Sequence, residues 1–98
     1  MNLVSVIIPT FNRESTLKRA ITSVLAQTYQ NLECIVVDDF SSDDTKELVL
    51  SIGDDRVKYT RNEENYGVSY SRNIGFKKSS GEFIALLDSD DEWLKDKL

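Results

Sequence analysis

The 98 residues suffice for one compact domain and exclude two, because a chain of this length buries only about 60 to 68% of the surface that it exposes when unfolded. A composition of 40% hydrophobic and 30% charged residues, with one proline and four glycines, excludes disordered and fibrous classes. The net charge of −5 argues against a nucleic-acid partner, one cysteine excludes an internal disulfide, and the absence of histidine removes the usual zinc ligand and general base.

Three apolar runs, residues 3–8, 32–37 and 83–87, are rich in Val, Ile, Leu and Phe, which predicts buried strands. Between the first two, apolar or small residues recur at helical spacing from Leu17 to Thr28, which predicts a helix over residues 14–28 with Asn12 as a possible N-cap. No run approaches the roughly 18 residues of a membrane span, and no signal peptide is visible. We therefore expect a cytoplasmic chain with no spanning segment.

A second helix is predicted after residue 40, capped by Ser41 or Ser42 and ended by Gly53. Its first turn holds Asp43 and Asp44, which suit the positive end of a helix dipole. Its inner face is formed by three apolar residues, Leu48, Val49 and Ile52.

Alternation around Val57 and Tyr59 then predicts a half-exposed strand at a sheet edge, and a turn at residues 65–67 leads into a helix through Lys78. The order is β-α-β-α-β-α-β. It predicts an α/β fold, a three-layer sandwich with a mostly parallel sheet covered on both faces.

Ligands of open parallel sheets bind beyond the carboxyl ends of the strands. Polar residues follow three of the predicted strands there: residues 9–13, the pair Asp38-Asp39, and residues 88–91. Five carboxylates on one rim would repel one another, which indicates a divalent cation, and oxygen ligands without histidine favour Mg²⁺ or Mn²⁺. If Asp88-Ser89-Asp90 is extended, the two carboxylates point the same way and can share one ion.

Structural alternatives stand beside these assignments. Residues 88–92 could cap a following helix that contains Trp93 and Leu94, and Asp38 and Asp39 could form a turn that caps the helix after it. Pro9 could simply end a strand and Phe11 could be a core residue. Arg13 and Arg72 could be solvated helix residues, or could contact a diphosphate at the acidic rim. The mid-strand Cys34 is expected to be an inert buried side chain.

Taken in order, these segments resemble one family, the inverting nucleotide-sugar glycosyltransferases of family 2 with the GT-A fold. Residues 4–12 resemble its first strand and loop, residues 25–29 the end of its first helix, and residues 36–39 its second strand. Residues 65–75 resemble its third helix and residues 88–91 its metal-binding Asp-x-Asp. The fold that this implies is the Rossmann-like nucleotide-binding half of GT-A enzymes, and the implied activity is hexosyl transfer from a nucleotide sugar, a UDP-sugar first of all.

The resemblance also implies roles. Residues Pro9, Thr10, Phe11 and Arg13 would line the nucleotide pocket, with the Phe11 ring beside the base, and Asp39 would accept from the base N–H. Asp88, with Ser89, would contact the nucleotide on its ribose side, and Asp90 with Asp88 would hold Mn²⁺ or Mg²⁺ at the diphosphate. The metal would stabilise the departing nucleoside diphosphate in a direct displacement.

Two departures from the family stand out. Phe40 occupies the place of a usual glycine, which makes any positive φ there costly. Family members also continue well past the Asp-x-Asp, and their second half supplies the acceptor site and the catalytic base. We therefore expect residues 1–98 to be one nucleotide-sugar-binding domain, truncated before the acceptor-binding half. It would bind the sugar donor and metal but transfer no sugar alone.

For a full-length enzyme the resemblance implies a saccharide or lipid-linked acceptor and, beside the cytoplasm, a place at the inner face of the membrane. Self-association is expected through apolar surface on the 83–87 strand. Three rival hypotheses are a phospho-receiver domain with its acidic pair at Asp38-Asp39, a haloacid-dehalogenase-type phosphotransferase using Asp88 and Asp90, and a non-catalytic interaction module. The first two conflict with the position of their motifs in the chain.

Overall fold

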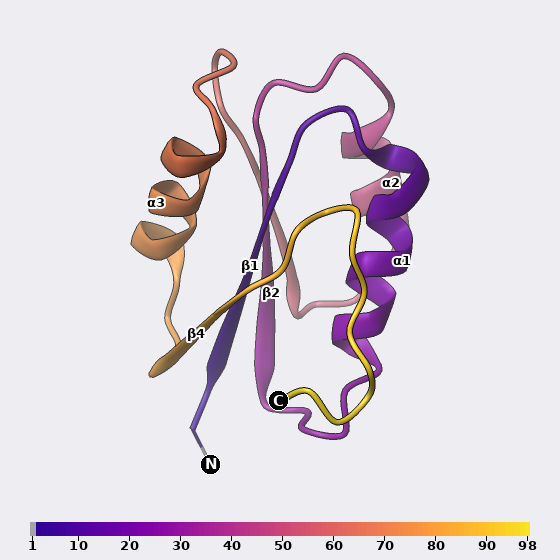
Figure 1. Cartoon of the computed structure of the whole chain (residues 1–98), viewed down its shortest axis with the longest axis vertical. Coiled ribbons are helices and arrows are strands. Elements are labelled where there is room, and N and C mark those ends of the chain that lie inside the picture. The colour runs from indigo at the N-terminus through magenta and orange to yellow at the C-terminus, as the bar shows by residue number, and fades with distance from the viewer. Residues whose placement is uncertain (1) are drawn as a thin grey trace.

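A computed structural model of the chain describes residues 2–98, and its seven elements alternate as expected (Figure 1). Each strand is followed by a helix until the last strand, which leads into a segment without helix or strand, residues 87–98. The elements are β1 (Val4–Thr10), α1 (Glu14–Leu25), β2 (Leu32–Asp38), α2 (Thr45–Ser51), β3 (Val57–Arg61), α3 (Val68–Lys78) and β4 (Phe83–Leu86).

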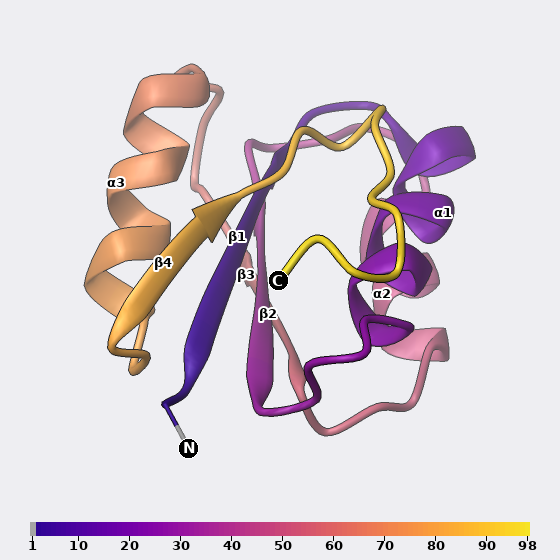
Figure 2. The same cartoon turned by 60° about the horizontal axis from the view of Figure 1, so that its bottom comes forward.

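The four strands form one sheet in the order β3-β2-β1-β4, and every neighbouring pair is parallel. Helices α1 and α2 cover one face of this sheet and α3 covers the other (Figures 1 and 2). The expected α/β three-layer sandwich is therefore confirmed, with β3 at one edge, as predicted, and β4 at the other.

The apolar strand residues build a core on each face of the sheet. On the α1 and α2 face, Val6 and Ile8 pack with the apolar side of α1, and on the α3 face Ile7 and Ile35 pack with Ile74. Cys34 lies in the first of these cores, fully buried, and burial raises the pKa of its thiol to about 12. Its thiolate is therefore scarce at neutral pH, as suits an inert side chain.

Helix α3 packs on the sheet through small residues. Its buried members are Ser71 and Gly75, whereas Tyr70 and Phe76 are exposed. A Cβ placed on Gly75 would lie 2.4 Å from Ile7 Cγ2, so only glycine allows the helix to approach this closely.

Two predicted features of the first helix are wrong. The helix ends at Leu25 rather than at residue 28, because the Thr28 N–H donates to Lys95 O at 2.8 Å instead of continuing the helical pattern. The N-cap position is Arg13 and not Asn12, and the Arg13 side chain makes no capping hydrogen bond. Asn12 has a positive φ of 51° and directs its side-chain oxygen to the loop after β2.

The predicted caps of the second helix are also wrong. Helix α2 begins at Thr45, after Asp44 at the N-cap position, so Asp43 and Asp44 precede its first turn. Asp43 Oδ1 accepts from the Thr45 N–H at 3.1 Å, while Ser41 and Ser42 instead bond to Asn12. The inner face is as predicted, since Val49 is buried and Leu48 and Ile52 pack against the core, and Gly53 follows the helix with a φ of 70°.

The last strand is one residue shorter than its apolar run, because it ends at Leu86. Leu87 is nevertheless buried, and its N–H donates to Ile7 O at 3.1 Å. Within residues 2–98, none of the helices combines the length and the apolar character that crossing a bilayer requires.

The close contact between Gly75 and Ile7 yields a stability prediction. We expect Gly75→Ala to lower the free energy of unfolding by about 1 to 3 kcal/mol, because the added methyl overpacks the contact with Ile7. Urea denaturation measures it, with Asn73→Ala on the exposed side of α3 as control, for which a change within about 0.5 kcal/mol is expected. Equal stability of the Gly75→Ala variant and the wild type would contradict this packing.

Candidate functional site

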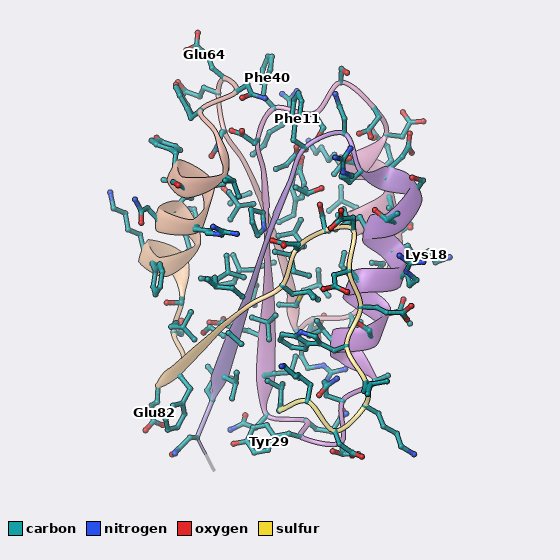
Figure 3. The ribbon with its side chains drawn as sticks, viewed as in Figure 1. Phe11, Lys18, Tyr29, Phe40, Glu64 and Glu82 are labelled. Atoms are coloured by element: carbon teal, nitrogen blue, oxygen red, sulfur yellow. The ribbon has the colours of Figure 1, made fainter. Side chains whose placement is uncertain are left out.

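A pocket of about 590 Å³ lies at the carboxyl end of the sheet, beside the ends of β1 and β4. This is the point where the strand order reverses, since the chain runs from β1 to β2 on one side while β4 pairs with β1 on the other. Figure 3 shows Phe11 and Phe40 at this end of the sheet, opposite Tyr29 and Glu82. The pocket is lined by residues 9–13, Asp39, Val68, Ser71 and residues 88–90.

The structure brings to this one pocket all the residues to which the family resemblance assigns a role. They come from three regions that are far apart in the sequence, the end of β1 with the loop after it, the loop after β2 and the segment after β4: Pro9, Thr10, Phe11, Arg13, Asp39, Asp88, Ser89 and Asp90. Phe11 is 43% exposed, so it is not a core residue. Thr10 is buried, and its Oγ1 has no hydrogen-bond partner among the described residues, which leaves a free polar group at the pocket wall.

The loops after β1 and β2 are bonded to each other. The Asn12 N–H donates to Ser41 Oγ at 2.9 Å, and the Ser42 N–H donates to Asn12 Oδ1 at 2.8 Å. The Glu14 N–H donates to Asp43 Oδ2 at 3.3 Å. These bonds fix the course of residues 10–13, and with it the position of Phe11.

Asp39 is almost fully buried and accepts three hydrogen bonds. Its Oδ1 accepts from Asn62 Nδ2 and from the Tyr66 N–H, and its Oδ2 accepts from the Gly67 N–H, all at 2.8 Å. The capping alternative for Asp39 is thus realised at the start of α3 and not at α2. A carboxylate offers about four acceptor positions, so Asp39 retains capacity for one more donor, on the side of the pocket that it lines.

The expected convergence of five carboxylates is wrong. Asp38 is buried and faces away from the pocket lining: its Oδ1 accepts from the Ser41 N–H at 2.9 Å and its Oδ2 from the Tyr59 hydroxyl at 2.6 Å. Burial and this bond to Asp38 raise the pKa of Tyr59. Among residues 2–98, no group of three or more acidic, cysteine or histidine side chains could hold a metal ion.

The segment that carries Asp88 and Asp90 is a turn and not an extended strand. The Asp91 N–H donates to Asp88 O at 3.1 Å, so the expected parallel orientation of the two carboxylates has no basis in strand geometry. Both residues nevertheless line the pocket. No helix follows in residues 89–98, so the alternative that these aspartates cap one is also wrong. Arg72 Nη2 lies 3.4 Å from Asp88 Oδ1 in a partly exposed pair, while the buried Arg72 Nε has no hydrogen-bond partner within residues 2–98.

The residues at this end of the pocket suit a hard divalent cation bound together with a ligand. Asp88 and Asp90 supply oxygen ligands only, both are exposed, and both line the same pocket. Mg²⁺ and its substitutes are held by one or two carboxylates, with substrate phosphates and water completing the coordination. Two carboxylates without a third therefore fit such an ion when a diphosphate accompanies it.

Phe40, beside the pocket residue Asp39, adopts the left-handed conformation that favours glycine, with a φ of 69°. The Arg61 guanidinium carbon lies 4.4 Å from its ring centroid, and Arg61 Nη2 donates to Ser41 O at 3.1 Å. The cation–π contact stabilises an exposed ring whose backbone is strained. The sequence predicts a cost in conformational energy if Phe40 has a positive φ, and the structure shows that it does.

Sequence reasoning missed three residues of the pocket lining: Asn12, Val68 and Ser71. Asn12 lies between two predicted pocket residues, Phe11 and Arg13, which could have indicated that it also lines the pocket. Its place just before the predicted helix favours a helix cap instead. Val68 and Ser71 lie in the first turn of α3, and only the placement of that helix on the sheet brings them to the pocket.

Comparison with a family model matches residues 5–98 to the description "Glycosyl transferase family 2". Among curated proteins, the chain is 50% identical to UDP-Glc:alpha-D-GlcNAc-diphosphoundecaprenol beta-1,3-glucosyltransferase WfgD of Escherichia coli, over 98% of the chain and 38% of that protein. It is 48% identical to GalNAc(5)-diNAcBac-PP-undecaprenol beta-1,3-glucosyltransferase of Campylobacter jejuni, over 100% of the chain and 33% of that protein. The chain thus spans only 33 to 38% of the length of these two relatives.

Among solved structures, residues 1–349 of S. aureus TarS in complex with UDP-GlcNAc superpose with a TM-score of 0.90 at 34% identity, over 97% of this chain and 28% of that TarS chain. The mannosyltransferase PcManGT of Pyrobaculum calidifontis, in complex with GDP-Man and Mn²⁺, superposes with a TM-score of 0.87 at 25% identity. That match covers 94% of this chain and 29% of the mannosyltransferase.

The strained Phe40 backbone gives a prediction that separates ring from backbone. Phe40→Gly and Phe40→Ala both remove the ring, so their difference reports the cost of a side chain at φ 69°. We expect the glycine variant to be more stable by about 1 kcal/mol in urea denaturation. The same pair at the exposed helical Ser69 is the control, where alanine is expected to be the more stable by about 1 kcal/mol. Equal or greater stability of Phe40→Ala would contradict the assigned conformation.

Proposed function

Because the chain belongs to glycosyl transferase family 2, we propose that it is the sugar-donor-binding domain of a nucleotide-sugar glycosyltransferase of the hexosyltransferase type. It binds a nucleoside-diphosphate sugar, with a UDP-sugar as the first choice, together with Mn²⁺ or Mg²⁺. The observation that carries the proposal is the single pocket in which an exposed aromatic ring, a buried carboxylate and two exposed carboxylates meet.

The pocket has the size that this ligand needs, and it combines an aromatic side chain for the base with carboxylates for the metal. Its volume of about 590 Å³ lies within the usual range of roughly 300 to 1,000 Å³ for small-molecule sites. Phe11 provides a flat apolar face for a base, and the remaining acceptor capacity of Asp39 suits a base N–H. Asp88 and Asp90 line the same pocket and suit a metal that a diphosphate shares. TarS and PcManGT, which have this fold, were solved with a UDP-sugar and with GDP-mannose plus Mn²⁺.

The residues then take the following roles. Pro9, Thr10 and Arg13 line the nucleotide pocket around Phe11, with the free Thr10 hydroxyl available to the nucleotide. Ser89 and Asp88 contact the nucleotide on its ribose side. Asp90, together with Asp88, holds the metal.

The bound metal would supply charge neutralisation for the departing nucleoside diphosphate. The chain's own residues bind and orient the sugar donor for displacement with inversion at the anomeric carbon. Deprotonation of the acceptor hydroxyl needs a base. We assign this base to a part of the full-length enzyme that corresponds to the region of the relatives outside their match to residues 1–98. We therefore expect the 98-residue chain alone to transfer no sugar, and the whole protein to be the enzyme.

The names of the curated relatives suggest the acceptor. The names of both relatives describe acceptors in which a sugar is linked to undecaprenol through a diphosphate. By analogy we propose a saccharide or lipid-linked acceptor for the full-length enzyme, and a cytoplasmic protein that works at the inner face of the membrane. The receiver and phosphotransferase hypotheses do not agree with the family membership, whereas a non-catalytic module of this family stays an outcome of the binding test.

Calorimetry with UDP tests the proposal. We expect UDP to bind in the presence of Mn²⁺ and to bind much more weakly with EDTA. Asp90→Asn should weaken binding about 10-fold or more, because even supporting residues of metal sites cost 10- to 100-fold. Asp91→Asn is the matched control, since Asp91 is exposed and does not line the pocket. If the folded protein binds no UDP, either with Mn²⁺ or without it, the result would contradict the proposal and favour the non-catalytic module.

Self-association is a further part of the proposal. Strand β4 is an edge of the sheet, and Phe83 and Leu86 on it are 57% and 46% exposed. We expect two chains to associate through this edge at high concentration, because unpaired strand edges with apolar side chains favour pairing. Light scattering should give a dimer mass that Leu86→Lys reduces to the monomer mass. A monomer mass for the wild type at high concentration would contradict this expectation.

A further inference from the structure

A polar stripe runs along α1 beside its apolar face, formed by Thr16, Arg19 and Ser23 and continued by Gln27 just beyond the helix end. Their spacing of three, four and four residues places them on one side of a helix. The neighbouring side, which packs on the sheet, is apolar: Leu17, Ala20, Ile21 and Val24. Helix α1 therefore has an apolar side that packs on the sheet and, beside it, a side whose polar groups are available for other contacts.

The polar stripe holds the backbone of the segment that follows β4. Thr16 Oγ1 donates to Ser89 O at 2.9 Å, and Arg19 Nη2 donates to Asp90 O at 3.3 Å. Ser23 Oγ accepts from the Trp93 N–H at 3.0 Å. Figures 1 and 2 show this last segment running alongside α1.

Gln27 continues the same pattern with both ends of its amide. Its Nε2 donates to Leu94 O at 2.7 Å and its Oε1 accepts from the Leu98 N–H at 3.0 Å. Gln27 is 1% exposed, an unusual burial for an amide side chain, and these bonds explain it. Residues 89–98 form no helix or strand, so α1 supplies hydrogen-bond partners that regular structure would otherwise give.

The first two bonds of the stripe lie at the proposed metal site. The carbonyl of Ser89, between the two aspartates, is bound by Thr16, and the carbonyl of Asp90 itself is bound by Arg19. The backbone bond from Asp91 to Asp88 lies within the turn at residues 88–91 and does not tie it to another element. Besides the exposed contact between Arg72 on α3 and Asp88, the bonds from Thr16 and Arg19 hold this turn to the rest of the fold, so its position relative to the pocket depends largely on α1.

We propose that the polar stripe of α1 positions the Asp88 and Asp90 carboxylates for metal binding, with Thr16 as the principal positioning residue. The proposal rests on the function proposed above, and it assigns a role to a residue outside the pocket lining. Thr16 touches neither the metal nor the nucleotide. It acts through Ser89, by holding the turn at residues 88–91 in the arrangement that metal binding needs. The turn then loses little conformational entropy when the metal binds, and the affinity for the metal is higher.

Thr16→Val tests this role, because valine keeps the shape and removes the hydroxyl. The affinity for Mn²⁺ is measured by electron paramagnetic resonance at saturating UDP, and we expect a loss of about 10-fold. Thr16→Ser should restore most of it. Thr22→Val is the matched control, since Thr22 is exposed on the same helix, and Ser23→Ala, which frees the more distant Trp93 N–H, should have a smaller effect than Thr16→Val.

Amide hydrogen exchange of the free protein provides a second readout that needs no ligand. We expect Thr16→Val to speed exchange of the Asp91 amide about 10-fold, since loss of one hydrogen bond of ordinary strength has that effect on local opening. Unchanged exchange would overturn the proposal whether or not metal binds. Faster exchange with unchanged Mn²⁺ affinity would show a purely structural role and also overturn it. If the wild type does not bind Mn²⁺ with UDP, the proposed function itself fails, along with the role of Thr16 in it.

Discussion

The buried carboxylate of Asp39 is the interaction on which the pocket depends. Its three hydrogen bonds join the end of β2 to the loop after β3 and to the start of α3. Its own N–H donates to Thr10 O at 2.8 Å, which joins the ends of β1 and β2. A buried carboxylate is tolerated only when its oxygens are satisfied, so these elements must meet at Asp39 for the chain to fold. The pocket walls are therefore set by folding itself.

The two ends of the pocket are held by different elements. Asp39 and the bonds between the first two loops hold the end that carries Phe11, whereas α1 holds the end that carries Asp88 and Asp90. Helix α3 contributes Val68 and Ser71 to the pocket lining and approaches the sheet closely because Gly75 has no side chain. A ligand that spans the pocket would thus contact parts of the chain that are already fixed, which limits the entropic cost of binding.

The sequence predicted the elements and most residues of the pocket lining better than the contacts among them. Three strands followed from their apolar runs and β3 from the alternation around Val57 and Tyr59, and the residues of the pocket lining followed mainly from their place after β1, β2 and β4. The caps failed because Asn12, Ser41 and Ser42, which are good local caps, form hydrogen bonds to each other across about 30 residues instead. No local pattern records such a pairing. For Asp38 the turn alternative is correct, because its Oδ1 accepts from the nearby Ser41 N–H. Its second partner, Tyr59, lies on another strand, and no local pattern predicts that bond.

Paramagnetic broadening in amide NMR spectra tests the central claim most directly, that sugar donor and metal occupy the pocket at the carboxyl ends of β1 and β4. With UDP and substoichiometric Mn²⁺, the account predicts strongest broadening at residues 88–91 and weaker broadening at residues 9–13. The contrary result is sharp signals at residues 88–91 with broadening at another acidic pair, such as Asp43-Asp44 or Asp54-Asp55. That result would place the metal elsewhere and contradict the account.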